Sequence, residues 1–271
     1  MSRHVVITGA ASGIGLQTAV RFAEAGDTVT LVDVRPAELA AAATTVTGAA
    51  GRAGSTPSAP VATIAADLRD PDGPDRVVAE AWATAPVDIL VNAAGVYPST
   101  PFLDLDAATW DAVQAVNLRA PLLATVALAR AAVREGRPAS VVNVSSGAAL
   151  RARPGAAPYS TSKAALEMAT KASALELGPH RIRVNAVAPG FVVVGSTVNP
   201  VSAEYAAQVS ANPLGRPGTP DDIARAVFWI AGQDAEWVTG TVLRVDGGSS
   251  TGAHTLPLSW GPDHDLEERN A

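Results

Sequence analysis

Tyr159 and Lys163 are the two residues of this sequence best suited to acid/base chemistry. They are four residues apart in a stretch with the pattern of a long helix ending at about Gly178, so both side chains lie on one helix face. A phenol loses its proton at about pH 10, and an ammonium group beside it favours the phenolate and lowers that pKa. Since a proton donor works best with a pKa close to the working pH, the pair suits chemistry at a carbonyl or alcohol oxygen. The alternative is plain helix surface, which is the commoner role of such a pair.

A glycine-rich turn near the N-terminus has the sequence context of a phosphate-binding motif. Residues 4–8 are a short β-branched run typical of a buried strand, and residues 9–15 lead from it into a helical pattern that ends at about Ala25. Glycine lets the backbone approach a pyrophosphate, and a helix N-terminus supplies N–H groups and partial positive charge. The spacing is G-x-x-x-G-x-G, so the motif departs from the commoner G-x-G-x-x-G. A dinucleotide site is therefore predicted, and a plain glycine turn is the alternative.

The second predicted strand, residues 28–33, ends in a carboxylate. Asp33 lies 24 residues after Gly9, near the distance at which an acid meets the adenosine ribose of a dinucleotide. A carboxylate there accepts hydrogen bonds from the ribose 2′-OH and repels a 2′-phosphate, which predicts NAD(H) over NADP(H). Arg35 argues in the opposite direction because it could reach a phosphate. A helix cap is the alternative role for Asp33.

Apolar strand-like runs and helical patterns alternate along the rest of the chain. The further predicted strands are residues 61–66, 87–91, 140–146, 181–188 and 241–245, and the further predicted helices are residues 37–47, 71–85, 107–135, 159–178 and 220–232. This alternation predicts an α/β fold, a doubly wound parallel sheet of about seven strands with helices on both faces. We expect one domain over residues 1–248 and a C-terminal extension over residues 249–271.

Residues that could bind or react follow the ends of the predicted strands. Besides the glycine turn and Asp33, they are Asp67, residues 92–95, Ser145, Ser146 and residues 189–190. Ligands of open parallel sheets bind beyond the carboxyl ends of the strands. We therefore expect these residues to gather at one edge of the sheet, with the Tyr159 helix directly after the serine strand.

The composition narrows the functional classes. The chain has 271 residues, 48% of them hydrophobic and 17% charged, with a net charge of −6 and no cysteine. The absence of cysteine excludes disulfides and thiol catalysis, and four scattered histidines do not form a metal-binding pattern. Since there is no basic block and no apolar run judged long enough to span a bilayer, we expect neither nucleic-acid nor membrane binding. A first strand near His4 leaves no room for a signal peptide, so we expect a cytoplasmic protein.

The chain resembles the short-chain dehydrogenase/reductase family in an ordered set of motifs over about residues 3–248. In order they are TGAASGIG, Asp33, Asp67, NAAG, Asn117, a serine-ending strand, YSTSK, PG and VDGG. The resemblance implies the single-domain Rossmann fold of the branch with about 250 residues. It implies an NAD-dependent oxidoreductase that interconverts a secondary alcohol and a ketone as a homodimer or homotetramer.

The resemblance also implies catalytic roles for four residues. Tyr159 is implied to be the general acid/base at the substrate oxygen, and Lys163 is implied to lower its pKa and to bind the nicotinamide ribose. Ser146, which precedes Tyr159 by 13 residues, is implied to hold the carbonyl oxygen by a hydrogen bond. Asn117 is implied to fix a water that links Lys163 to solvent.

Cofactor-binding roles follow from the same resemblance. The implied residues are Gly9, Ser12, Gly13, Ile14, Gly15, Asp33, Asp67, Leu68, Asn92, Ala93, Gly95, Tyr159, Lys163, Pro189, Gly190 and Val192. One position departs from the family pattern, because Val194 stands where a threonine often holds the nicotinamide amide. Ser196 or Thr197 could replace that threonine, and the backbone of Val192 could contact the amide.

Several alternatives stay open. The chain could be a reductase of 3-oxoacyl thioesters, although its acidic surface argues against an acidic acyl carrier as partner. It could also be a catalytically silent nucleotide-binding regulator, but such a protein has no need for Ser146, Tyr159 and Lys163 together. Arg151 and Arg153 could bind a substrate carboxylate or phosphate, or belong to a solvated loop. The tail could dock through residues 256–260 or be disordered.

Overall fold

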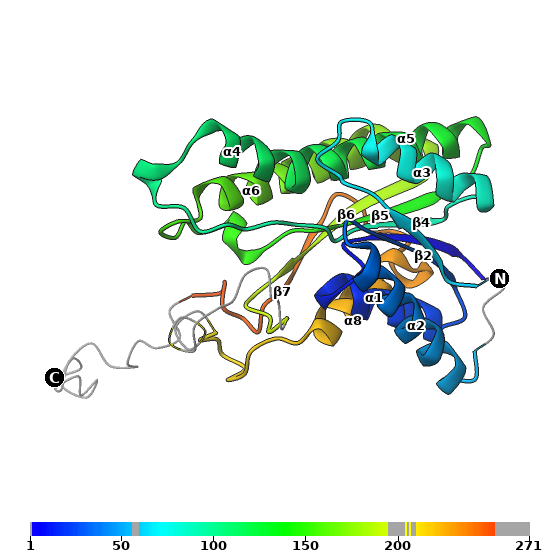
Figure 1. The fold of residues 1–271 in the computed structure, drawn as a ribbon, viewed down its shortest axis with the longest axis horizontal. Coiled ribbons are helices and arrows are strands. Elements are labelled where there is room, and N and C mark those ends of the chain that lie inside the picture. Colours follow the sequence, from blue (N-terminus) through cyan, green and yellow to red (C-terminus); the bar gives the residue numbers. More distant parts are fainter. Residues whose placement is uncertain (1, 56–59, 195–203, 205, 207–209, 253–271) are drawn as a thin grey trace, which may run out of the picture.

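Seven parallel strands form one sheet in the computed structural model, which describes residues 2–55, 60–194, 204, 206 and 210–252 (Figure 1). The order across the sheet is β3-β2-β1-β4-β5-β6-β7. The strands are β1 His4–Thr8, β2 Thr28–Asp33, β3 Ala62–Ala65, β4 Ile89–Asn92, β5 Ala139–Val144, β6 Ile182–Pro189 and β7 Val242–Val245. Every residue of β1, β4 and β5 is buried, which explains the uninterrupted apolar runs at residues 5–7, 89–91 and 141–142 within them.

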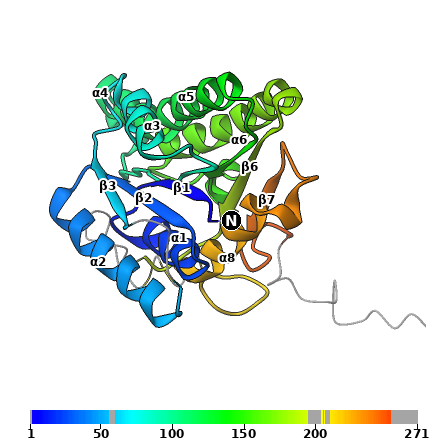
Figure 2. The same cartoon turned by 90° about the vertical axis from the view of Figure 1, so that its right-hand side faces the viewer.

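Helices cover both faces of the sheet (Figures 1 and 2). On one face lie α1 Gly13–Glu24, α2 Pro36–Arg52 and α8 Pro220–Ala231. On the other lie α3 Gly73–Thr84, α4 Ala107–Gln114, α5 Ala120–Arg134 and α6 Ala157–Leu177. Short 3-10 segments are η1 Phe102–Asp104, η3 Gly147–Ala149, η4 Gly178–His180 and η5 Gln233–Ala235. The predicted fold, a doubly wound Rossmann sheet of about seven strands, is confirmed.

Each strand sends alternate side chains into two separate cores. Val5 and Ile7 of β1 pack with α1, α2 and α8, whereas Val6 between them packs with α3, α5 and α6. The largest side chain of the first core is Phe22 on α1, which is fully buried. Its ring packs against Phe228 of α8 with the ring centroids 5.1 Å apart and the planes tilted by 50°. These two cores hold the carboxyl ends of the strands in a fixed relative position.

One predicted helix is in fact three segments. Between α4 and α5 the chain forms a π-helical turn, η2 Ala115–Arg119, in which the Ala120 N–H reaches the Ala115 carbonyl five residues back. Asn117 lies inside this turn and is fully buried. The π turn inserts one residue into the helical ladder, and such insertions occur often at functional sites.

The same stretch corrects the expectation about apolar length. Ala107–Arg134 is long and apolar enough to cross a membrane by length and composition alone, so the statement that no run reaches that length was wrong. Half of its most apolar window is buried inside the protein. Its apolar residues, such as Leu128, contribute to the core that α3, α5 and α6 share with the sheet. Helix packing therefore accounts for the composition of this stretch.

The chain reverses direction across the sheet between β1 and β4. It runs from β1 outward through β2 to β3, and then returns to pair β4 with the opposite side of β1. Beyond the carboxyl ends of these two strands lie the glycine turn, residues 9–15, and residues 92–95. Such a switch point is the place where open α/β sheets bind ligands.

Candidate active site

Three side chains on one face of α6 meet the carboxyl end of β5. Tyr159, Lys163 and Glu167 are spaced by four residues each, so they lie one above another along the helix. The Tyr159 phenol is hydrogen-bonded to Ser146, and Lys163 Nζ donates to the Val144 carbonyl at 2.8 Å. The α6 helix therefore holds the end of β5 through successive turns, and it brings the predicted Ser146, Tyr159 and Lys163 together.

The environment of Tyr159 acts on the pKa of its phenol in both directions. Burial raises the pKa of the Tyr159 phenol, whereas the hydrogen bond with Ser146 and the positive charge of Arg153 lower it. Lys163 Nζ lies 5.9 Å from the centre of the Tyr159 ring, and Lys163 is not among the groups that lower this pKa. Arg153 thus supplies a favourable electrostatic effect on the phenolate, and the effect expected of Lys163 stays a prediction.

The pKa of Lys163 is also shifted far from its usual value. Lys163 is only 4% exposed, and burial lowers the pKa of its ammonium to about 8. A Cβ added to Gly95 would lie 3.7 Å from Lys163 Nζ and 3.5 Å from the Asn117 amide oxygen. Gly95, Lys163 and Asn117 therefore line the same small space at the end of β4.

Asn117 connects this space to α6. Its side-chain oxygen accepts from the Val96 N–H at 2.8 Å, and its amide nitrogen donates to the Val96 carbonyl at 2.8 Å and to Ser162 Oγ at 3.1 Å. Ser162 in turn donates to the Tyr159 carbonyl at 2.7 Å. Asn117 thus ties the segment after β4 to the helix that carries Tyr159, a role that explains a buried amide inside a helix. Its implied role in holding a water stays a prediction.

The glycine turn is shaped for close backbone approach. Gly9 has a φ of +66°, and a Cβ there would lie 2.7 Å from the Ala94 backbone. A Cβ on Gly15 would lie 2.2 Å from the Gly9 carbonyl oxygen. Thr8 Oγ1 accepts from the N–H groups of Ala93 and Ala94 at 3.1 and 3.2 Å, which fixes the segment after β4 against this turn. The first turn of α1, whose N–H groups have no partner within the helix, therefore borders a turn of the kind that can accept an anion.

Asp33 is already fully engaged within the protein. Its carboxylate accepts from the Ala11 N–H at 3.2 Å and from the backbone N–H and Nε of Arg35, both at 3.1 Å. A second guanidinium nitrogen of Arg35 lies 3.4 Å from the carboxylate and donates to Ser12 Oγ at 3.1 Å. Arg35 thus bridges the end of β2 to the glycine turn, a contact that spacing alone did not reveal.

Other predicted cofactor residues have partners of their own. Asp67 pairs with Arg69 at 2.7 Å, and the Arg69 side chain lowers the pKa of its carboxyl. The amide of Asn92 donates to Asn143 Oδ1 at 2.9 Å, so this side chain links β4 to β5 within the sheet. Only its backbone is then available at the switch point between β1 and β4. Leu68 is half-buried against the core shared with α3 and α5.

The segment after β6 is held by backbone contacts. A Cβ on Gly190 would lie 2.8 Å from the Asp246 Cα, and Val192 forms a parallel bridge with Gly218. The bridge consists of the Gly218 N–H to the Phe191 carbonyl at 2.9 Å and the Val193 N–H to the Gly218 carbonyl at 3.2 Å. Ser196 and Thr197, the suggested substitutes for the family threonine, lie outside the described residues.

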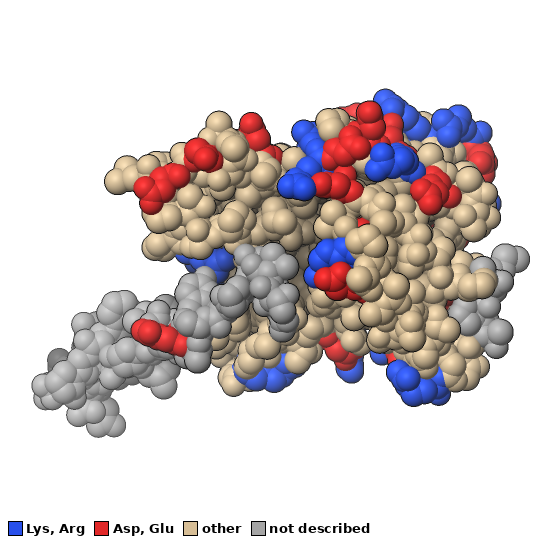
Figure 3. Space-filling view, in the orientation of Figure 1, with Lys and Arg blue, Asp and Glu red and all other residues tan. Residues whose placement is uncertain are grey.

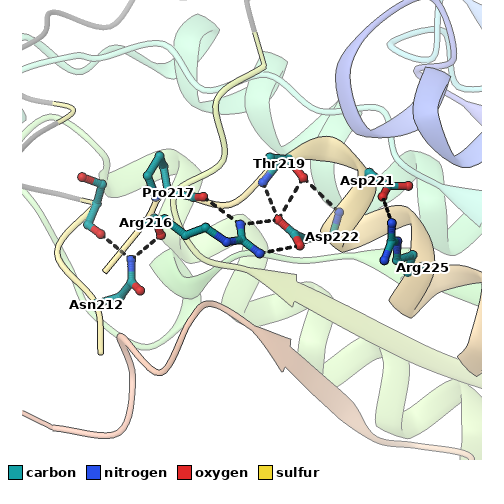
Figure 4. A network of polar contacts seen from close by, with 8 residues as sticks. Asn212, Arg216, Pro217, Thr219, Asp221, Asp222 and Arg225 are labelled. Carbon is teal, nitrogen blue, oxygen red and sulfur yellow. Dashed lines mark hydrogen bonds and ion pairs between the residues drawn. The ribbon is translucent and has the colours of Figure 1, made fainter. Parts of the chain in front are cut away.

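A polar network anchors Gly218 from the other side (Figure 4). Arg216 contacts both oxygens of Asp222 at 2.7 and 2.8 Å, and Asp222 and Thr219 cap each other at the start of α8. The Asn212 amide nitrogen donates to the Arg216 carbonyl at 2.8 Å. The network fixes the chain that borders Val192, which places it next to the predicted nicotinamide end of the site.

Charged side chains are unevenly distributed on the face shown in Figure 3. Basic and acidic side chains are mixed over α3 and α5, acidic side chains lie over α4, and the rest of this face is largely uncharged. Among the described residues, no group of three or more His, Asp or Glu could hold a metal ion. The polar groups of the site are therefore side chains suited to hydrogen bonding and proton transfer.

Comparison with known proteins gives matches along nearly the whole chain. The family model described as enoyl-(acyl carrier protein) reductase matches residues 9–250. Galactitol 2-dehydrogenase (L-tagatose-forming) of Cereibacter sphaeroides is 37% identical over 246 residues, covering 89% of this chain and 92% of that protein. The 3-oxoacyl-[acyl-carrier-protein] reductase FabG of Thermotoga maritima is 34% identical, covering 90% of this chain and 96% of that protein.

A solved structure of similar fold contains a coenzyme. The structure of 4-hydroxyisoleucine dehydrogenase complexed with NADH superposes with a TM-score of 0.81 at 28% identity, covering 93% of this chain and 100% of that one. The family model spans most of the chain, and one relative is 37% identical over nearly its full length. Together these matches identify the family. The chain belongs to the short-chain dehydrogenase/reductase family.

Proposed function

We propose that this protein interconverts a secondary alcohol and a ketone with NAD(H), and that Tyr159 is its general acid/base. The observation that carries the proposal is the position of the Tyr159 phenol, bonded to Ser146, with Lys163 one helical turn away. Tyr159 and Ser146 are only partly buried, so a substrate oxygen can reach both. Lys163 and Asn117 are buried, which suits residues that hold the active-site side chains in place better than residues that touch the substrate.

The crevice residues fit a dinucleotide. A Cβ on Gly9 or Gly15 would collide with neighbouring backbone, so only glycine allows this tight turn, and the N-terminus of α1 offers N–H groups to a pyrophosphate. We assign the pyrophosphate to Gly9, Ser12, Gly13, Ile14 and Gly15. The adenosine half is assigned to Asp33, Asp67 and Leu68, and the nicotinamide half to Asn92, Ala93, Gly95, Tyr159, Lys163, Pro189, Gly190 and Val192.

The bound coenzyme supplies the hydride in reduction and accepts it in oxidation. During reduction, the Ser146 hydroxyl donates a hydrogen bond to the carbonyl oxygen and Tyr159 transfers its proton to the same oxygen. The Lys163 ammonium stabilises the phenolate that remains. During oxidation the phenolate removes the hydroxyl proton, so the same three residues serve both directions.

Two observations support NAD(H) over NADP(H). Asp33 presents a carboxylate at the end of β2, where it repels a 2′-phosphate, and a relative of the same fold is solved with NADH. Arg35 beside Asp33 is the observation on the other side. The preference for NAD(H) is therefore one of degree.

The relatives suggest two substrate classes. The galactitol dehydrogenase supports a polyol or keto sugar, which fits the alcohol–ketone chemistry proposed for Tyr159. The second candidate is a 3-oxoacyl thioester, favoured by the similarity to the 3-oxoacyl reductase. Both substrates place a carbonyl at Ser146 and Tyr159, so the reaction is the same.

We further propose a cytoplasmic homodimer or homotetramer. The outer faces of α5 and α6 expose four large apolar side chains, Leu122, Val133, Met168 and Leu175. Burial of these residues against a second copy would remove them from water. Light scattering on a sizing column measures the mass, and a monomer at micromolar concentration would disprove this assembly.

The decisive experiment is a substrate panel followed at the nicotinamide absorbance. The panel contains galactitol with NAD, and L-xylulose and acetoacetyl-CoA with NADH. Tyr159→Phe should lower kcat by about 100-fold or more while NADH binding stays within about twofold, because only the proton donor is lost. A Tyr159→Phe protein that retains wild-type turnover would refute the proposed mechanism.

A further inference from the structure

Glu167 extends the line of Tyr159 and Lys163 along α6 by one more turn, and no role in the reaction has been assigned to it so far. One carboxylate oxygen accepts from Ser145 Oγ at 2.9 Å. Ser145 is 3% exposed and immediately precedes Ser146. The Glu167 side chain is therefore tied to the residue that directly precedes the serine of the proposed active site.

The same carboxylate is held from a second strand. The other oxygen of Glu167 lies 3.4 Å from a guanidinium nitrogen of Arg244 on β7, and the two side chains are 13% and 28% exposed. In the sheet, Arg244 stands beside Ala188 of β6, and the Ser145 N–H donates to the Val187 carbonyl at 2.8 Å. Glu167 therefore joins the ends of β5 and β7 across the top of β6.

We propose that Glu167 and Arg244 are a pair of positioning residues for the reaction: Glu167 fixes Ser145 so that the next residue, Ser146, faces Tyr159, and Arg244 neutralises the carboxylate. This inference rests on the proposed function. Without Arg244, the negative charge of Glu167 would act on two groups one and two helical turns away, Lys163 and Tyr159.

The charged and titratable groups around Glu167 are few. Arg244 faces it from β7, and Lys163 and Tyr159 precede it on its own helix. Lys171, one turn further along, is exposed. β5 contains no charged residue at all.

On β6, the charged side chain points elsewhere. Arg183 donates to the carbonyls of Ile230, Ala231, Gly232 and Val238, at 2.9 to 3.0 Å. The balance of charge beside Glu167 is therefore set by Arg244.

The sign of the expected pH effect follows from this balance. Alcohol oxidation requires the Tyr159 phenolate, so its rate rises with pH as the phenol loses its proton. We call this rising part of the pH–rate profile the limb. Arg244→Gln leaves the Glu167 charge unopposed, disfavours the phenolate and moves the limb to higher pH. Glu167→Gln keeps an acceptor for Ser145 but removes the negative charge, so it moves the limb to lower pH.

The experiment uses the full chain with the panel substrate that it turns over, and it measures kcat, KM, the pH profile and NADH binding by fluorescence. Glu167→Ala should lower kcat about tenfold and leave NADH binding within about twofold, because Ser146 loses its support while the coenzyme contacts remain. The two glutamine variants should shift the limb by about half a pH unit or more in opposite directions, and the double variant should shift it less.

Arg137→Gln is the matched control. Arg137 pairs with Asp88 at 3.2 Å at the amino end of β4, away from the active-site edge, so its loss should move neither kcat nor the limb. Limbs that shift in the same direction, or not at all, would overturn the proposal even if Glu167→Ala does not fold. Variants with wild-type kcat and unshifted limbs, beside an inactive Tyr159→Phe, refute the positioning pair alone; an active Tyr159→Phe refutes the proposed function and this inference together.

Discussion

Arg35 donates to Asp33 from its backbone N–H and its guanidinium group, at 3.1 to 3.4 Å, and so occupies the carboxylate proposed for the adenosine ribose. With the Ala11 N–H, the carboxylate accepts four hydrogen bonds, which is about the full capacity of its two oxygens. A ribose hydroxyl can bind Asp33 only if Arg35 moves aside. An Arg35 side chain released in this way carries the charge that a 2′-phosphate needs.

Replacement of these two residues should therefore change coenzyme preference in opposite directions. Arg35→Ala should raise the ratio of kcat/KM with NADH to kcat/KM with NADPH by about tenfold. The reason is that the Asp33 carboxylate becomes free to accept hydrogen bonds from the ribose hydroxyls of NADH, while the 2′-phosphate of NADPH loses the Arg35 guanidinium. Asp33→Ala should lower the ratio by a similar factor. Steady-state kinetics with both coenzymes measures the effect. Arg76→Ala, which removes a surface pair with Asp70, is the control and should leave the ratio unchanged.

The pH profile of alcohol oxidation should depend on Lys163. Burial lowers the pKa of Lys163 to about 8, so its positive charge is present below that pH and is lost above it. Lys163→Met removes the charge at every pH, which disfavours the phenolate and should move the limb to higher pH while kcat falls about 100-fold. Lys171→Met removes an exposed lysine from the same helix and should do neither. An unshifted limb in Lys163→Met would contradict the assigned role.

Arg153 should affect both acidity and substrate choice. Because its charge lowers the pKa of the Tyr159 phenol, Arg153→Ala should move the oxidation limb to higher pH. If Arg153 also binds a substrate carboxylate, the variant should lose about tenfold in kcat/KM for a carboxylated ketone relative to its neutral analogue. Arg151 donates to the Ser249 carbonyl at 2.9 Å, so Arg151→Ala serves as the control. An unchanged preference would end the carboxylate hypothesis while leaving the acidity effect to be judged separately.

The network at the start of α8 should contribute to stability in a pH-dependent way. Hydrogen bonds from Arg216 and the Thr219 N–H lower the pKa of Asp222, so the carboxylate stabilises the fold at neutral pH and this contribution is lost as the pH falls through the lowered pKa. Asp222→Asn should reduce the free energy of unfolding by about 1 kcal/mol at pH 7, and the difference should shrink below about pH 4.

Urea unfolding at two pH values measures this difference. Asp221→Asn is the matched control, because Asp221 forms only an exposed pair with Arg225 one turn along the same helix (Figure 4). Loss of this ion pair should reduce the free energy of unfolding by no more than about 0.5 kcal/mol. Equal effects of the two substitutions would show that the cap adds nothing beyond a surface ion pair.

Local sequence pattern was sufficient to predict the strands and most helices. Parallel strands buried on both faces are rich in β-branched and apolar residues, so β1, β2 and β5 were each predicted to within two residues at either end. The order of turn residues after the strands predicted which side chains meet at one edge, including Ser146 beside Tyr159. The α2 helix runs through Gly48 and Gly51 to Arg52, beyond the predicted end, because alanine-rich flanks and packing offset the cost of glycine.

Contacts between elements could not be predicted in the same way. The partner of Asp33 depends on how Arg35 folds back over the end of β2, and the roles of Thr8 and Glu167 depend on which strand each meets across the sheet. Spacing placed Lys163 on the face of Tyr159, but it could not show that Lys163 Nζ donates to the Val144 carbonyl. Spacing identifies a shared face and does not determine the direction of each polar group.

The π-helical turn at Ala115–Arg119 determines how α5, which follows it without a break, is rotated about its axis relative to α4. One inserted residue turns the remainder of a helix by about 100° about its axis. The angular position at which α5 presents Leu122 and Val133 outward is thus determined by the same insertion that buries Asn117 next to Lys163. Removal of a single residue there would displace the Asn117 amide and turn Leu122 and Val133 away from their present outward position at the same time, so the proposed catalytic centre and the outer surface of α5 cannot change independently in this part of the chain.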